Sequence, residues 1–276
     1  MTCLRPVVLG VNDDLTPMAV PCGKCMPCRV QVTREWKVRL MNELHGKYGV
    51  FLTLTFDEEN LEDNSLDKDE LRRFLRRLEY EIGRFRHYSV GEYGSRTARK
   101  HYHSIVLTDE KAEWTPYKHS NGFWSSKLVD RIWLRGTNCY GTATAESIQY
   151  CTGYVRKKLN GSCAEREYMG RQAPFAIFSR GLGKEYALKN RHVFESDRGF
   201  THYGKNQGVP RYYMKLFGEE FKKTAKEKSQ ENLIKALTKY GSYHNLNMAE
   251  LSDSERRQAE IDRKAINDWL NPKTRL

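Results

Sequence analysis

Two histidines, His101 and His103, stand one residue apart at the start of the apolar run "HYHSIVL". Side chains alternate between the faces of a β-strand, so we expect both imidazoles on one face and Tyr102 on the other. Glu92 precedes His101 by nine positions, which is close enough for a hairpin to bring them together. Two imidazoles and a carboxylate can hold Mg²⁺ or Mn²⁺. A histidine pair without a metal, at the surface or satisfied in the core, is the simpler alternative.

Two tyrosines, Tyr150 and Tyr154, are four residues apart in the helix-like segment "AESIQYCTGYVRKKL", which Thr144 can cap. This spacing places them on one helix face, with two lysines one turn further on. A phenol has a pKa near 10, so attack at neutral pH requires help from a metal or another cation. Attack on a phosphate held at the histidine pair would leave a phosphotyrosine. The alternative is that both rings pack in a core.

These residues must be positioned by a small set of elements. The segments 50–56, 86–94 and 101–108 have the composition of strands, and the spacing of apolar residues predicts helices over 66–82 and from about residue 29. A helix followed by consecutive strands favours an α+β fold with an antiparallel central sheet flanked by helices.

The remaining chain is less periodic. Residues 109–143 read mostly as loop, with a short strand around Ile132, and the charged segment after residue 218 has a helical pattern. We therefore predict a Cys-rich segment with a basic helix over 1–48, a core over 49–217 and a helical C-terminal extension over 218–276.

The charge balance points to a polyanionic partner. The chain has 47 Lys and Arg residues against 35 Asp and Glu, a formal net charge of +12. Such a field favours nucleic acid or an anionic surface. The sequence contains no apolar run of membrane-spanning length, and its first residues lack the pattern of a signal peptide. We expect a cytoplasmic protein that does not span a membrane.

Three cysteines, Cys22, Cys25 and Cys28, lie in "CGKCMPC" at a spacing that suits zinc. A structural zinc site needs a fourth ligand, which Cys3 or His45 can supply. A reduced cysteine turn without metal is equally compatible with the pattern. The zinc deaminase motif needs an earlier His-x-Glu, and no histidine precedes Cys22, so this class is excluded.

A basic segment with aromatic residues, "GKNQGVPRYYMKLF", has the composition of a strand-binding surface. We expect phosphate contacts from Lys205, Arg211 and Lys215 and base stacking by Tyr212 or Tyr213, although an ordinary solvated segment has the same composition. The arginines of the 66–82 helix fit a solvated face better than a DNA contact. "GLGK" lacks the frame of a phosphate-binding loop, so no ATPase is predicted.

Taken in order, "FLTLTF", "GEYG", "HYH" and "YCTGYVRKK" resemble the motifs of HUH endonucleases that initiate rolling-circle DNA replication. The paired tyrosines are similar to those of the subgroup found in small single-stranded-DNA phages. "VPCGKCMPC", "KKLNG" and "GVPRYYMKL" extend the resemblance to the replication initiators of gokushovirus-type microviruses, over roughly residues 20–217.

The resemblance implies a site-specific nick in the viral origin strand, a 5′-phosphotyrosine link and a free 3′-hydroxyl that primes synthesis. It implies that His101 and His103 bind the metal, with Glu92 where a third ligand is often found. It also implies that Tyr150 and Tyr154 are nucleophiles and that Lys157 assists them; Lys158 is expected to contact DNA. Host helicase and polymerase would then act on the nicked strand in the cytoplasm of a bacterium.

A non-catalytic basic DNA-binding protein with a structural zinc is the principal alternative, and an RNA-binding protein is a third. Covalent chemistry distinguishes the enzyme from both binding proteins. A binding protein associates reversibly and with salt-dependent affinity, whereas the enzyme leaves a product that survives denaturation.

Overall fold

The computed structural model describes residues 3–4, 6–11, 17–61, 63–94, 96–118, 124–157, 168–194, 200–202 and 205–221. The chain divides into two compact units, one formed by residues 1–31 with 219–276 and the other by residues 32–218. The predicted helical extension lies almost entirely outside the described residues.

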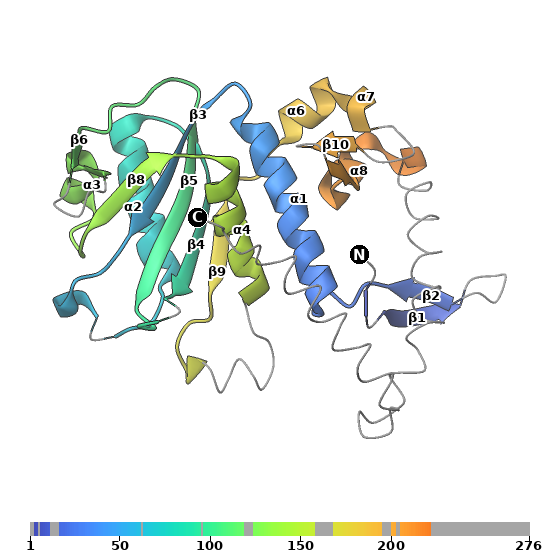
Figure 1. The fold of residues 1–276 in the computed structure, drawn as a ribbon, viewed down its shortest axis with the longest axis horizontal. Helices are drawn as coiled ribbons and strands as arrows, with labels where there is room; N and C mark the ends of the chain where they lie inside the picture. The colour runs from blue at the N-terminus through green and yellow to red at the C-terminus, as the bar shows by residue number, and fades with distance from the viewer. Residues whose placement is uncertain are drawn as a thin grey trace. The chain divides into compact units, whose positions relative to one another are not determined.

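The second unit is built on a five-stranded sheet with the strand order β8-β3-β5-β4-β9 (Figure 1). Every neighbouring pair in this sheet is antiparallel, and β5 lies at its centre. The strands are β3 (Tyr48–Leu54), β4 (Arg86–Tyr93), β5 (Lys100–Thr108), β8 (Asn138–Thr142) and β9 (Phe175–Phe178). The predicted α+β class and the three predicted strands are confirmed.

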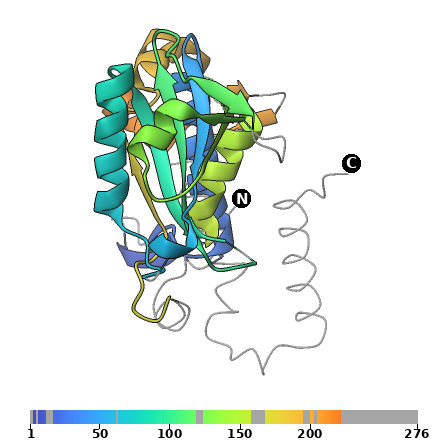
Figure 2. The ribbon, with the colours of Figure 1, turned by 90° about the vertical axis from the view of Figure 1, so that its left-hand side faces the viewer.

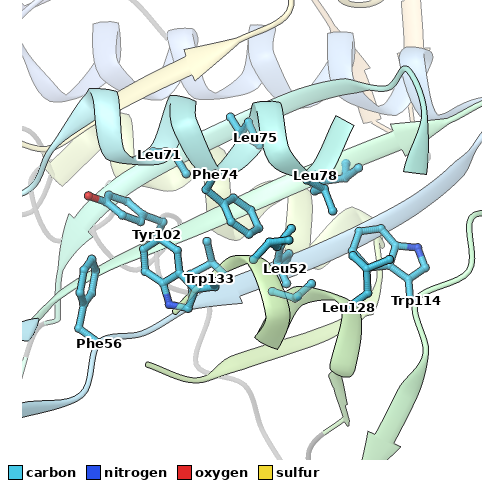
Figure 3. Close-up of a cluster of buried hydrophobic side chains, with 14 of the residues drawn as sticks. Leu52, Phe56, Leu71, Phe74, Leu75, Leu78, Tyr102, Trp114, Leu128 and Trp133 are labelled. Atoms are coloured by element: carbon cyan, nitrogen blue, oxygen red, sulfur yellow. The ribbon is translucent and has the colours of Figure 1, made fainter. Parts of the chain in front are cut away.

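Helices cover both faces of this sheet. One face packs against α2 (Lys68–Ile82) and the short α3 (Lys127–Ile132), and its buried cluster includes Tyr102 (Figure 3). The other face packs against α1 (Met26–Leu44) and α4 (Ala145–Lys157), which contribute Leu40 and Ile148 to a second cluster. Figure 2 shows α2 and α4 on opposite sides of the strands. The alternation of β5 therefore assigns Tyr102 to one layer and Ile105 to the other.

The α2 helix begins as the sequence predicts. The Asp67 side chain accepts a hydrogen bond from the backbone N–H of Asp69 and caps the first turn. Its apolar residues face the sheet, whereas its arginines lie on the exposed side. The buried residues of the helix are Leu71, Phe74, Leu75 and Leu78.

The segment 109–143 contains more regular structure than predicted, and the strand expected around Ile132 is wrong. Ile132 ends the helix α3, and Ser126 caps that helix by accepting a hydrogen bond from Val129. The segment also forms the strands β6 (Pro116–Lys118) and β7 (Trp124–Ser126). A six-residue helix is too short to show a periodic pattern, so its buried positions are set by packing against the α2 layer.

Short elements complete the second unit. After β9 come α6 (Lys184–Lys189), α7 (Arg191–Phe194), the paired strands β10 (Phe200–His202) and β11 (Lys205–Gln207), and α8 (Arg211–Phe217). A single 3-10 turn, η1 (Glu58–Asn60), precedes α2.

The first unit contains a small antiparallel hairpin. Its strands are β1 (Val7–Val11) and β2 (Pro17–Val20), and the chain then enters the first turns of α1. Among the described helices of the whole chain, none combines the length and apolar character that a membrane span requires.

Candidate active site

The hairpin of β4 and β5 brings Glu92 beside both histidines. Glu92 is paired across the two strands with His101, and Val90 with His103. Glu92 and His103 are each only 4% exposed, so the site closes an otherwise apolar face of the sheet. Tyr88, Val90, Ile105 and Leu107 form the rest of that face. The predicted alternation along both strands is confirmed.

The three side chains converge on one point. His101 Nε2 lies 2.6 Å and His103 Nε2 lies 3.2 Å from Glu92 Oε1. One ligand atom from each residue falls within 4.8 Å of the others. Burial opposes ionisation of Glu92, but hydrogen bonds from both imidazoles outweigh it, and the pKa of Glu92 is lowered. A buried carboxylate with two imidazole nitrogens is a donor set that fits a divalent cation.

Each histidine is oriented through its other ring nitrogen. His101 Nδ1 lies 3.1 Å from the carbonyl oxygen of Arg99, to which it can only donate. His103 Nδ1 lies 2.9 Å from Thr53 Oγ1 on the neighbouring strand β3. These contacts direct both Nε2 atoms toward Glu92, as is usual for histidines that bind metals.

Thr53 is the site residue that the sequence does not single out. It lies directly across from His103 in the β3–β5 register. The segment "FLTLTF" contains Thr53 and Thr55 in the same alternation. Only the strand register, which the sequence alone does not specify, identifies which threonine meets the histidine.

The two tyrosines of α4 lie against His103. The ring centroid of Tyr150 is 5.1 Å from that of His103, and the ring of Tyr154 stacks on His103 at 5.5 Å. The tyrosine rings contact each other edge to face at 4.9 Å. The predicted helix face is therefore confirmed, and it is directed at the histidine pair.

The two hydroxyl groups differ in exposure and in electrostatics. Tyr150 is 50% exposed, whereas Tyr154 is 5% exposed. Burial raises the pKa of both phenols, and the charge of Glu92 raises both further. A hydrogen bond between them lowers the pKa of Tyr150 and raises that of Tyr154, because Tyr154 is the donor. A cation beside Glu92 would reverse the effect of that carboxylate on both phenols.

The α4 helix is held firmly at the point where it carries the tyrosines. Thr144 Oγ1 accepts from the backbone N–H of Ser147 and caps the helix as predicted. Ile148 and Cys151 are fully buried against the sheet. Thr33 of α1 donates a hydrogen bond to the backbone carbonyl of Thr152. The tyrosines therefore project from a rigid helix.

The basic residues predicted near DNA are only partly described. Lys157 ends α4, but its side chain lies outside the described part of the chain, as do the side chain of Lys205 and all of Lys158. On α8, Lys215 is exposed, Arg211 pairs with Glu35 at 3.2 Å, and Tyr212 packs under the guanidinium of Arg39.

Tyr213 has a structural role. It is fully buried, and its hydroxyl accepts a hydrogen bond from Asn42 Nδ2 at 3.0 Å. The suggestion that Tyr213 stacks on bases is therefore wrong, because packing against α1 withdraws the ring from solvent.

The three cysteines of "CGKCMPC" also come together, separately from the histidine cluster. Their Sγ atoms and that of Cys3 all lie within 4.8 Å of one another. His45, the other residue considered as a fourth ligand, instead contacts the ring of Tyr186. Of the two candidates for the fourth position, the structure selects Cys3.

Comparisons with known proteins support the resemblance seen in the sequence. Residues 49–159, which contain every residue of the histidine and tyrosine cluster, match the family model of the replication-associated protein ORF2. The chain is 26% identical to replication-associated protein VP4 of Bdellovibrio phage phiMH2K, over 95% of this chain and 88% of that protein. It is 28% identical to replication-associated protein ORF2 of Spiroplasma virus 4, over 76% and 70% respectively. No solved structure matches the chain.

A third relative is replication-associated protein ORF4 of Chlamydia phage 1, at 30% identity over 71% of this chain and 53% of that protein. The resemblance to the replication proteins of gokushovirus-type microviruses is thereby confirmed.

Proposed function

We propose that this chain, as a relative of microvirus replication-associated proteins, initiates replication by nicking the origin strand of a single-stranded-DNA phage with a tyrosine nucleophile. The observation that carries the proposal is the convergence of two tyrosines on His103, which itself contacts Glu92. Nucleophiles and a metal-type donor set from different elements meet at one place, as a metal-assisted phosphoryl transfer requires.

A divalent cation, Mg²⁺ or Mn²⁺, would be held by His101, His103 and Glu92. When bound, it would neutralise charge on the scissile phosphate and orient the leaving oxygen. The side chains of the protein then have defined tasks. Thr53 and the Arg99 carbonyl fix the imidazole tautomers, and the α4 helix presents the phenols to the phosphate.

The covalent step is an exchange of phosphate ester bonds. The Tyr150 oxygen forms a bond to phosphorus and loses its proton to solvent, while the bond from phosphorus to the 3′ oxygen breaks. The leaving oxygen takes up a proton and becomes the free 3′-hydroxyl, and the 5′ end of the strand stays linked to the tyrosine. The reverse exchange joins strands, so a second tyrosine allows the regenerated origin to be attacked while the first still holds DNA.

We assign the first attack to Tyr150. Its side chain is half exposed, whereas Tyr154 is buried beneath it against His103. The Tyr154 hydroxyl donates to the Tyr150 oxygen, an interaction that stabilises a developing phenolate. In this conformation Tyr154 supports Tyr150, and its own attack requires the helix face to open.

The net charge of +12 supports a single-stranded DNA partner. Lys157, Lys158, Lys205, Arg211, Tyr212 and Lys215 are the residues that we propose to contact it. Because "GLGK" is not a nucleotide-binding loop, unwinding and synthesis are assigned to the helicase and polymerase of the bacterial host.

Replacing Thr53 with valine is expected to weaken Mn²⁺ binding by about 10- to 100-fold, because the His103 ring loses its orienting partner. Isothermal titration with Mn²⁺ measures the effect. Thr55→Val is the matched control, since Thr55 Oγ1 donates to the Thr137 carbonyl instead of a histidine. Equal affinities in the two variants would contradict the role given to Thr53.

The ends of the cleaved strand test the proposed function. We expect a 3′ end that DNA polymerase extends and a 5′ end that stays blocked until the protein is digested. A 5′ phosphate that is free without digestion would show that water, not tyrosine, attacks phosphorus. A protein that binds DNA reversibly and leaves it intact would instead match the DNA-binding alternative.

A further inference from the structure

The first unit has a core made almost entirely of cysteine. Among its described residues, the buried cluster consists of Cys3, Ala19 and Cys28, with Cys22 and Cys25 packed against it. A two-stranded hairpin is marginally stable in water without further support. One alanine and four small thiols bury too little apolar surface to provide that support.

The four sulfurs have the spacing of a metal site. All four lie within 4.8 Å of one another, and the Sγ atoms of Cys3 and Cys25 are 3.8 Å apart. A tetrahedral zinc site with Zn–S bonds of about 2.3 Å places its sulfurs about 3.8 Å from each other. A disulfide would need about 2.05 Å, and all four thiols are free.

The backbone around the cluster is also arranged for thiolates. The N–H of Cys25 donates to Cys22 Sγ, and the N–H of Cys22 donates to Cys3 Sγ, both at 3.3 Å. Gly23 adopts a φ of 72°, a left-handed conformation that glycine accepts without strain. It allows the "CGKC" turn to fold back so that these N–H groups point at sulfur.

We propose that this cluster binds one zinc ion through four thiolates, those of Cys3, Cys22, Cys25 and Cys28. Each ligand comes from a different piece of local structure. Cys3 precedes β1, Cys22 and Cys25 bracket the turn after β2, and Cys28 lies in the first turn of α1. The ion therefore links the N-terminal residues, the hairpin and the start of the helix, and it replaces the missing apolar core. Its role is structural, since four protein ligands leave no open position.

Metal content distinguishes this site from the histidine site. Full-length protein from zinc-supplemented cells, washed with EDTA, is analysed by mass spectrometry of its metals. We expect one zinc ion per chain in the wild type, in the His101→Ala/His103→Ala variant and in the Cys139→Ser control, and loss of zinc in Cys3→Ser. Zinc that follows the histidines, iron in place of zinc, or no bound metal would overturn the proposal.

A second measurement needs no variant and so does not depend on whether Cys3→Ser folds. Wild-type protein stripped of metal under reducing conditions is titrated with Co²⁺, which reports coordination through its visible spectrum. We expect the absorption bands of tetrahedral Co²⁺ together with strong thiolate-to-metal charge transfer in the near ultraviolet, and their loss when zinc is added. A spectrum without charge transfer would contradict a four-thiolate site. Neither measurement depends on DNA cleavage.

Discussion

Replacing His103 with alanine is expected to slow strand cleavage by about a thousandfold, a loss of about 4 kcal/mol of transition-state stabilisation. His103 is 4% exposed and contacts Glu92, Thr53 and both tyrosines, so its loss disrupts the ligand set and the seat of the nucleophiles together. Affinity for single-stranded DNA is expected to be retained, because it depends mainly on phosphate contacts made by lysine and arginine.

The measurement compares cleavage rate, DNA affinity and melting temperature in the same preparations. His87→Gln is the matched control. His87 lies on the adjacent strand β4, where it contacts Ser89 and faces the α2 side of the sheet. We expect the control to cleave at the wild-type rate. Parallel losses of cleavage, DNA binding and thermal stability in His103→Ala would indicate a structural histidine and contradict the metal site.

Replacing Tyr150 with phenylalanine is expected to remove most of the initial nicking, whereas Tyr154→Phe is expected to retain it with a rate reduced about tenfold or less. The difference follows from exposure, 50% against 5%, and from the hydrogen bond that Tyr154 donates to Tyr150. The double variant is expected to form no covalent product, because no phenol is left at the site.

Single-turnover nicking of an oligonucleotide that carries the origin measures these rates. Tyr80→Phe serves as the control, since Tyr80 is 90% exposed on α2, which covers the other face of the sheet. Equal losses in the two single variants would argue against the assigned order. Nicking by the double variant at the wild-type rate would exclude both tyrosines as nucleophiles.

The sequence predicts the parts of the site that depend on local periodicity. Alternation along β4 and β5 is enough to place Glu92, His101 and His103 on one face, and the four-residue spacing of Tyr150 and Tyr154 is enough to place both on one side of α4. The order of these motifs then indicates the family, and the comparisons bear this out.

The parts that were not predictable depend on contacts between distant segments. Thr53 is identified only by the β3–β5 register, and Cys3 only by the path of the N-terminal residues back to the "CGKC" turn. Tyr213 has the composition of a base-stacking residue, but packing against α1 buries it. Ile132 belongs to a helix of six residues, a length at which tertiary packing outweighs local pattern.

The most direct test of the proposed mechanism is the transfer of labelled DNA to the protein. Single-stranded origin DNA, labelled on the 3′ side of the nick, is incubated with the protein in Mn²⁺ or in EDTA and run on a denaturing protein gel. The account predicts label that migrates with the protein in Mn²⁺ only, and that disappears in the Tyr150→Phe/Tyr154→Phe variant. Cleavage or binding of the DNA by wild-type protein without any labelled protein band would contradict a tyrosine nucleophile.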